Sequence, residues 1–250
     1  MTKSVSFDVA LDVSEALPPD LASRVIATLN PRAKRLSLRV DPASGHIVLV
    51  RPKRASAGVT LKFLASREAW IRKHLATLPP HIPFADDASI PVGGTNHRLQ
   101  LVPGGRGGVW REGEVIMISG QPEFIARRLT DWLKQEARRE LTPMAHAMAL
   151  PLGCKVKHVT ARDTSSRWGS CSPDGRLSFS WRLILAPRSV LIYVAAHEVA
   201  HLKHLNHGRA FWRTVDEVLD CYVKEPEMRR EAGLARDWLH RHGAALHRYG

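Results

Sequence analysis

Residues 195–208 read AAHEVAHLKHLNHG, and this stretch decides how the rest of the sequence is interpreted. His197 and His201 are four residues apart, so on a helix both imidazoles leave from one face, one turn apart. Glu198 lies between them on a neighbouring face. Two histidines and an adjacent carboxylate in an apolar helix are the residue types that zinc-dependent hydrolysis needs. The stretch therefore predicts a helix that carries a catalytic zinc site.

His207 is the candidate third ligand, six residues beyond His201. A continuous helix turns about 100° per residue, so it would point His207 away from the first two histidines. Asn206 and Gly208 favour the end of a helix, because both residue types tolerate the left-handed conformations found there. We therefore expect the helix to end just before Asn206 and the chain to turn His207 back towards the metal. His204, or a carboxylate further along the chain, is the alternative.

The composition is that of a soluble protein with an unusual charge. The chain has 250 residues and a net charge of +13, which implies either attraction to polyanions such as nucleic acid or only an arginine-rich composition. The three cysteines form no CxxC pair, so a disulfide framework is not expected. No signal peptide and no apolar run long enough to span a membrane are recognisable. We expect a cytoplasmic protein without a membrane span, of undetermined oligomeric state.

The N-terminal part of the sequence predicts an α+β region with β-hairpins. Residues 21–29 are a candidate short helix, strands at 35–40 and 47–50 form a hairpin, and residues 58–78 form an amphipathic helix. A linker is expected at 79–90. Strands at 97–102 and 108–118 follow as a second hairpin, joined by the glycine-rich residues 103–108, which lack the Lys-Ser/Thr of a phosphate-binding loop. No internal repeat is recognisable in the sequence.

The C-terminal part predicts a helix packed on a small sheet. Pro122 begins a long helix, which Pro143 is expected to kink or interrupt. The further elements expected along this part are strands at 155–162 and 177–185 and helices at 187–205, 208–219 and from 227 onward. We therefore predict a division into residues 1–120, an N-terminal α+β region, and residues 121–250, a metallopeptidase domain.

The sequence resembles the YgjP-like (SprT-like) zinc metallopeptidases over about residues 155–220. The motifs that carry the resemblance are RWGSC at 167–171, WRL at 181–183, YV at 193–194, HEVAHL at 197–202, and NH at 206–207 followed by FW at 211–212. Val199 replaces the leucine that is usual in the family. The resemblance implies a zincin-like catalytic core in an α+β fold, with His197, His201 and His207 as zinc ligands and Glu198 as the catalytic base. It also implies a peptide or protein as the substrate.

The loop before the second predicted strand has two interpretations. Arg167 and Trp168 either border the cleft, with Arg167 binding an oxyanion or an anionic substrate group, or the RWGSC segment only packs and turns. Cys171 is either a small buried hydrophobe or a fourth metal ligand.

Three functions compete on this sequence. The first is a zinc metallopeptidase that uses Glu198 as the general base, on substrates that include proteins bound to nucleic acid. The second is a metal-dependent nucleotide phosphohydrolase, which would normally require two metals or an acidic Mg²⁺ site, and no such acidic cluster is recognisable. The third is a nucleic-acid-binding module with a structural zinc site, in which Glu198 would have no use.

Overall fold

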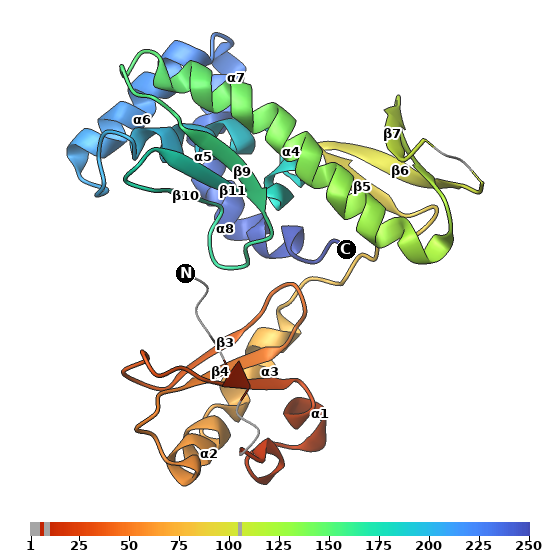
Figure 1. Cartoon of the computed structure of the whole chain (residues 1–250), viewed down its shortest axis with the longest axis vertical. Coiled ribbons are helices and arrows are strands. Elements are labelled where there is room, and N and C mark those ends of the chain that lie inside the picture. The colour runs from red at the N-terminus through yellow and green to blue at the C-terminus, as the bar shows by residue number, and fades with distance from the viewer. Residues whose placement is uncertain (1–5, 8–10, 105–106) are drawn as a thin grey trace. The chain divides into compact units, whose positions relative to one another are not determined.

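The computed structural model describes residues 6–7, 11–104 and 107–250. The chain divides into two compact units, Met1–Pro80 and His81–Gly250 (Figure 1). Both units combine helices with small sheets, so the fold is α+β, as the sequence predicts. The boundary drawn from the sequence lies at residue 120 instead. Residues 81–120 belong to the second unit because their strands share a hydrophobic core with the long helix that follows them.

The first unit is built on a four-stranded sheet in the order β1-β2-β4-β3. The bounds of these strands are Ser6–Phe7 (β1), Val25–Leu29 (β2), Ser37–Val40 (β3) and Ile47–Arg51 (β4). The hairpin of β3 and β4 is the one that the sequence predicts, and its turn is stabilised by Asp41, whose Oδ1 accepts hydrogen bonds from the backbone of Ala43 and Ser44. Ile47 and Leu49 of β4 form the core of the unit.

Two predictions in the first unit are wrong. Residues 21–29 are not a helix: α1 covers only Pro19–Ala22, and the chain continues as β2, where Val25 and Ile26 suit a strand that pairs with β4. The helix predicted over 58–78 is two helices, α2 (Ala57–Ala65) and α3 (Glu68–Ala76). Ser66 lies at the break, and its hydroxyl donates to the carbonyl of Phe63, which offers the backbone an alternative to the next helical turn.

The second unit begins with a sheet in the order β5-β6-β8-β7. Its strands are Ser89–Val92 (β5), Thr95–Val102 (β6), Val109–Glu112 (β7) and Val115–Ser119 (β8). The predicted strand 108–118 is therefore β7 and β8, separated by a turn at Gly113, which has a φ of 57°. The predicted hairpin across 103–108 is wrong, because β8 lies between β6 and β7. Residues 105–106 of that segment lie outside the described residues.

The two four-stranded sheets have the same topology. In each, the second and fourth strands along the chain are parallel neighbours in the centre, and the first and third strands are antiparallel edges. The structure thus contains a repeated arrangement that the sequence does not reveal.

A long helix joins this sheet to the part of the unit that carries the motifs quoted above. The 3₁₀ segment η2 (Pro122–Phe124) leads into α4 (Ile125–Ala149), which continues through Pro143 (Figure 1). The predicted interruption is therefore wrong. Pro143 lies on the exposed face of α4, where water can bind the carbonyl that the missing N–H leaves free.

The second sheet of this unit has three strands in the order β10-β11-β9, with bounds His158–Arg162 (β9), Gly169–Cys171 (β10) and Arg176–Ser180 (β11). Helix α4 packs against β9, and α5 (Arg188–Ala200) packs against β10. The predicted strand 177–185 ends at Ser180, and a 3₁₀ segment, η3 (Trp181–Leu185), follows. All five residues of η3 are buried, so the alternation that a half-buried strand requires is lost there.

Three helices complete the unit, α6 (Arg209–Tyr222), α7 (Pro226–Gly233) and α8 (Ala235–Leu246). The C-terminal end is held by Arg182 of η3, which is only 6% exposed. Its guanidinium donates to Asp163 and to the backbone carbonyls of Leu246 and Tyr249, at 3.1, 3.1 and 2.7 Å. Arg182 thereby fixes the end of α8 next to the loop that precedes β10.

Candidate active site

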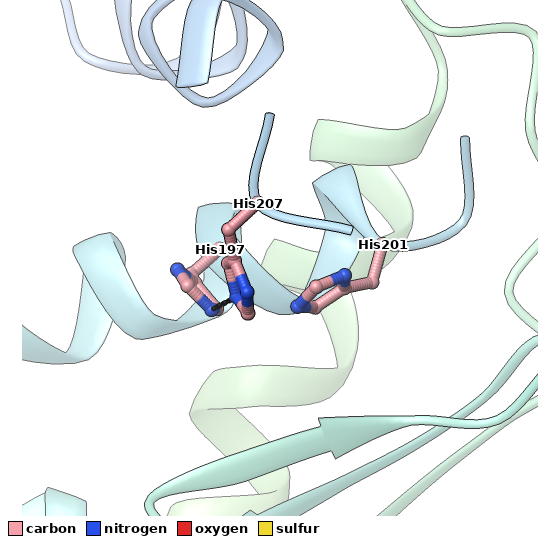
Figure 2. Close-up of side chains that lie close together, drawn as sticks. All are labelled: His197, His201 and His207. Atoms are coloured by element: carbon pink, nitrogen blue, oxygen red, sulfur yellow. Dashed lines mark hydrogen bonds between the residues drawn. The ribbon is translucent and has the colours of Figure 1, made fainter. Parts of the chain in front are cut away.

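Three histidines from two segments come together at the end of α5. His197 lies in the last turn of α5, His201 is the residue that ends it, and His207 precedes α6. One ring nitrogen from each lies within 4.8 Å of the others, and Nε2 of His207 is 3.2 Å from Nε2 of His197. Figure 2 shows the three rings facing one another. Of the residues that the structure describes, these are the only His, Cys, Asp and Glu grouped closely enough to hold a metal ion.

Helix α5 ends earlier than the sequence predicts. It stops at Ala200 rather than near residue 205, and the amide of His204 donates to the carbonyl of Ala200 in a final turn. This turn places the backbone carbonyl of His204 2.9 Å from Nδ1 of His201. If Nδ1 carries the proton, it donates to that carbonyl and leaves Nε2 of His201 free to bind a metal. The ring of His204 is not part of the group.

Phe211 supports all three imidazoles. It is fully buried in α6, and its ring centroid lies 4.9, 4.5 and 4.7 Å from those of His197, His201 and His207. Trp212 packs at 5.8 Å from both His197 and His207. The FW pair that follows the NH motif therefore positions the ring of each histidine by direct packing.

The protonation states suit metal binding. Burial, together with the charges of the nearby His201 and His207, lowers the pKa of His197 to about 4. Burial also lowers the pKa of His201. Both rings are therefore neutral at pH 7, which is the form of imidazole that binds a metal.

Glu198 lies next to this group and is 5% exposed. Burial raises the pKa of its carboxyl group to about 7, while the positive charge of Arg167 acts in the opposite direction. A carboxyl group that titrates near neutral pH can both accept and donate a proton under ordinary conditions. This is the behaviour expected of a general base that later returns the proton.

Gly169 makes room for Glu198. A Cβ atom on Gly169 would lie 2.5 Å from Cγ and 2.6 Å from Oε1 of Glu198, closer than real atoms approach. The sequence predicts only packing or a turn for the segment that contains this glycine, whereas the structure uses it for the close approach of strand β10 to α5. The sequence carries no signal for that approach, since it depends on the pairing of distant segments.

His197, His207 and Glu198 open into a cavity of about 870 Å³. Arg167 and Trp168, the predicted cleft residues, both line it. Trp168 also stacks on His247 at 4.9 Å, and a Cβ atom on Gly243 of α8 would come within 2.9 Å of its ring. Trp168 thus both borders the cavity and anchors the loop, so the two interpretations of that loop do not exclude each other.

Helix α8 supplies cleft residues that the sequence analysis did not select. Arg236 and His240 line the same cavity, together with Tyr193 of α5. The guanidinium of Arg236 lies over the ring of Trp212, 5.9 Å from its centroid, and its charge reaches His197. Arg236 and His240 are four residues apart, which places them on one face of a helix. That spacing was the only sign of these two cleft residues in the sequence.

Cys171 lies apart from the histidines. Burial raises the pKa of its thiol to about 11, with the charge of Glu198 next in effect, and the thiol donates to the carbonyl of Ser172. A thiol that stays protonated is a poor metal ligand. The idea of Cys171 as a fourth ligand is therefore not supported by its surroundings.

Comparison with known proteins assigns the family. The sequence model of the YgjP-like metallopeptidase domain matches residues 34–229. No curated protein and no solved structure matches the chain. In the described part of the chain, no helix is both long and apolar enough to cross a membrane. The prediction of a nucleic-acid partner finds no support in these comparisons and stays a prediction. The match spans well over half of the sequence and includes the three histidines and Glu198, and the chain therefore belongs to the YgjP-like metallopeptidase family.

Proposed function

We propose that the protein is a zinc-dependent peptidase in which His197, His201 and His207 hold the metal and Glu198 is the general base. The observation that carries the proposal is the position of Glu198, a buried carboxyl group that borders the same cavity as the imidazoles of His197 and His207. A buried ionisable group lowers the stability of the fold unless it is paired, and such groups are found at functional sites. Proton transfer next to a metal is a function that suits Glu198.

The residues present fit zinc. Two imidazole nitrogens bound to one tetrahedral zinc ion lie roughly 3.3 Å apart, given zinc–nitrogen distances of about 2.0–2.1 Å. The corresponding distance between His197 and His207 is 3.2 Å. Three histidine ligands leave the fourth position open, which is typical of catalytic rather than structural sites. Zinc bound there would acidify a water molecule and polarise the carbonyl group to be cleaved.

The residues of the chain itself account for the proton transfers. Glu198, with its pKa near 7, takes a proton from the attacking water and delivers it to the leaving amine. Arg167 stands at the same cavity and supplies a positive charge for an oxyanion or another anionic group of the substrate. Burial raises the pKa of Tyr193, which also lines the cavity, so its hydroxyl remains a proton donor.

A polypeptide fits the surroundings of Glu198 better than a nucleotide does. Strand β10 is an edge strand, and its Gly169 approaches Glu198 directly. An edge strand offers unpaired backbone groups to which an extended peptide adds as a further strand. A two-metal phosphohydrolase would need a second cluster of ligands, and the residues described by the structure form only one. A purely structural zinc site would have no use for Glu198.

The test compares Glu198→Gln with the wild-type protein after zinc has been measured in both by elemental analysis. Each is incubated with casein and, separately, with nucleoside triphosphates. We expect the wild type to cleave casein, and the variant to keep its zinc while its rate falls by about 10²–10⁴-fold, the usual contribution of a general base.

Glu217→Gln is the matched control, because Glu217 is exposed on α6 and forms only a surface ion pair with Arg213. It should cleave casein at the wild-type rate. Phosphate release that disappears in Glu198→Gln would replace the peptidase by a phosphohydrolase. Bound zinc without either activity would favour a structural site.

A further inference from the structure

In the described part of the second unit, one face of the three-stranded sheet beside the active site stays open. Val159, Leu177 and Phe179 point to the buried face, towards α4 and α5. On the opposite face, Ser170, Ser178 and Thr160 lie side by side across the three strands, since Ser170 pairs with Ser178 and Ser178 with Thr160. All three are partly exposed. This open face is polar throughout and presents hydroxyl groups at its centre.

The open face forms a groove of about 730 Å³ that is lined entirely by residues 158–178. Arg162, Arg167 and Arg176 line it, whereas Asp174 is its only carboxylate. Asp174 already pairs with Arg176 at 3.1 Å and accepts a hydrogen bond from Ser172. In the described part of the chain, neither Arg162 nor Arg167 has a carboxylate within ion-pair distance. Among the described residues, the groove therefore has two arginines that form no ion pair, of which Arg167 also acts through its charge on the carboxyl group of Glu198.

The groove and the active-site cavity share one lining residue. Arg167 lines both. Strand β10 follows directly, and its successive residues point to opposite sides: Gly169 faces Glu198, and Ser170 faces the groove. A peptide added to the free edge of β10 would likewise point alternate side chains towards the metal site and towards the groove. Every second side chain of such a peptide would meet hydroxyl groups and arginines.

We propose that the open face of the β10-β11-β9 sheet binds acidic side chains at alternate positions of an extended polypeptide substrate. This inference rests on the proposed peptidase function. Arginine guanidinium groups bind carboxylates by paired hydrogen bonds, and serine and threonine hydroxyls donate to the same oxygens. The lining has no Phe, Tyr or Trp side chain on which bases could stack, and stacking is how single-stranded nucleic acid is usually held. The groove thus selects acidic peptide rather than nucleic acid.

Binding is measured by fluorescence anisotropy with the full-length, zinc-loaded Glu198→Gln protein, which holds peptides without cutting them. Three labelled peptides are compared: one with glutamate at alternate positions, one with glutamine at those positions, and one with the same glutamates placed consecutively. Single-stranded oligothymidylate is the fourth probe. We expect the alternating glutamate peptide to bind about tenfold more tightly than the other two peptides, and more tightly than the oligothymidylate.

Arg162→Gln, introduced in the same protein, identifies the groove. It should weaken binding of the alternating glutamate peptide about three- to fivefold and leave the glutamine peptide unchanged. Arg138→Gln is the matched control, since Arg138 is an exposed arginine on α4 without an ion-pair partner in the described part of the chain. It removes the same charge and should change neither affinity.

Equal affinity for the glutamate and glutamine peptides would overturn the proposal. So would equal losses in Arg162→Gln and Arg138→Gln, because the effect would then be one of net charge. Preferred binding of oligothymidylate that depends on Arg162 would make the groove a nucleic-acid surface instead. The two proposals can be contradicted separately. If the wild type cleaves acidic and neutral peptides equally well, only the proposal for the groove is wrong. If the glutamate peptide binds tightly but no peptide is cleaved, only the peptidase proposal is wrong.

Discussion

Helices α5 and α8 border one cavity, but they differ in almost every other respect. Helix α5 is nearly all buried and carries His197 and Glu198, and His201 caps its C-terminal end. Helix α8 buries only Ala235, Gly243 and Leu246, and contributes Arg236 and His240 to the opposite wall. The family match ends at residue 229, before α8 begins. The proposed metal ligands and general base thus lie within the family match, whereas part of the cavity lining, Arg236 and His240, lies beyond it.

The sharpest test on the α5 side compares His207→Ala with His204→Ala. His207 contributes a ring nitrogen to the group of three, whereas His204 contributes only a backbone carbonyl. We expect His207→Ala to weaken zinc binding by about a hundredfold or more, because loss of a ligand exceeds the loss of a residue that only orients one. His204→Ala keeps its carbonyl and should bind zinc normally. Competition with a chelator measures both, and equal losses would contradict the assignment of His207.

The α8 side depends on Arg182. Its replacement by methionine would leave the buried carbonyl of Leu246 and that of Tyr249 without their donor. We expect the free energy of unfolding to fall by about 2–4 kcal/mol. Arg188→Met is the control, since the Arg188–Glu140 pair lies at the surface and should contribute less than about 1 kcal/mol. Urea denaturation compares the two, and a similar small change in both would show that α8 is held by other contacts.

The burial of α5 predicts an effect of pH on the metal-free protein. Folding raises the pKa of Glu198 from 4.5 to about 7, so its contribution to stability is fully present below pH 4.5 and is lost as the pH rises through about 7. Metal-free Glu198→Gln should therefore be more stable than the metal-free wild type at about pH 8, by up to about 3 kcal/mol.

That difference should disappear near pH 4.5. The titration of His197 is present in both proteins and cancels in the comparison. Unfolding in the presence of a chelator measures the difference. A difference that does not change with pH would mean that Glu198 is not buried as described.

The smallest expected effect concerns the gap between β10 and α5. Gly169→Ala would place a methyl group against Glu198 and displace its carboxyl group. We expect kcat for peptide cleavage to fall about tenfold while zinc binding is unchanged, since misplacement of a catalytic group by a fraction of an ångström is costly. Gly58→Ala, where nothing lies within 4 Å of the added atom, should leave kcat unchanged. Full activity of Gly169→Ala would show that the position of the Glu198 carboxyl group does not depend on the close approach of β10 to α5.

The difference between α5 and α8 also explains what the sequence could predict. Local spacing was sufficient for the β3–β4 hairpin and for placing His197, His201 and Glu198 on one helix. It was not sufficient where distant segments decide the structure: Val25–Leu29 becomes a strand because β4 is its neighbour, and β8 inserts between β6 and β7. The clearance at Gly169 and the cleft residues of α8 depend on packing between segments far apart in the sequence.

The proposed peptide cleavage requires one zinc ion, which three histidines hold. It also requires Glu198 as the general base. The most direct test is a titration of metal-free protein with zinc, in which bound zinc and casein cleavage are followed in parallel. We predict that cleavage rises in proportion to zinc and reaches its maximum at one ion per chain, while Glu198→Gln binds zinc equally but stays inactive. Cleavage by the metal-free protein, or full activity of zinc-loaded Glu198→Gln, would contradict the account.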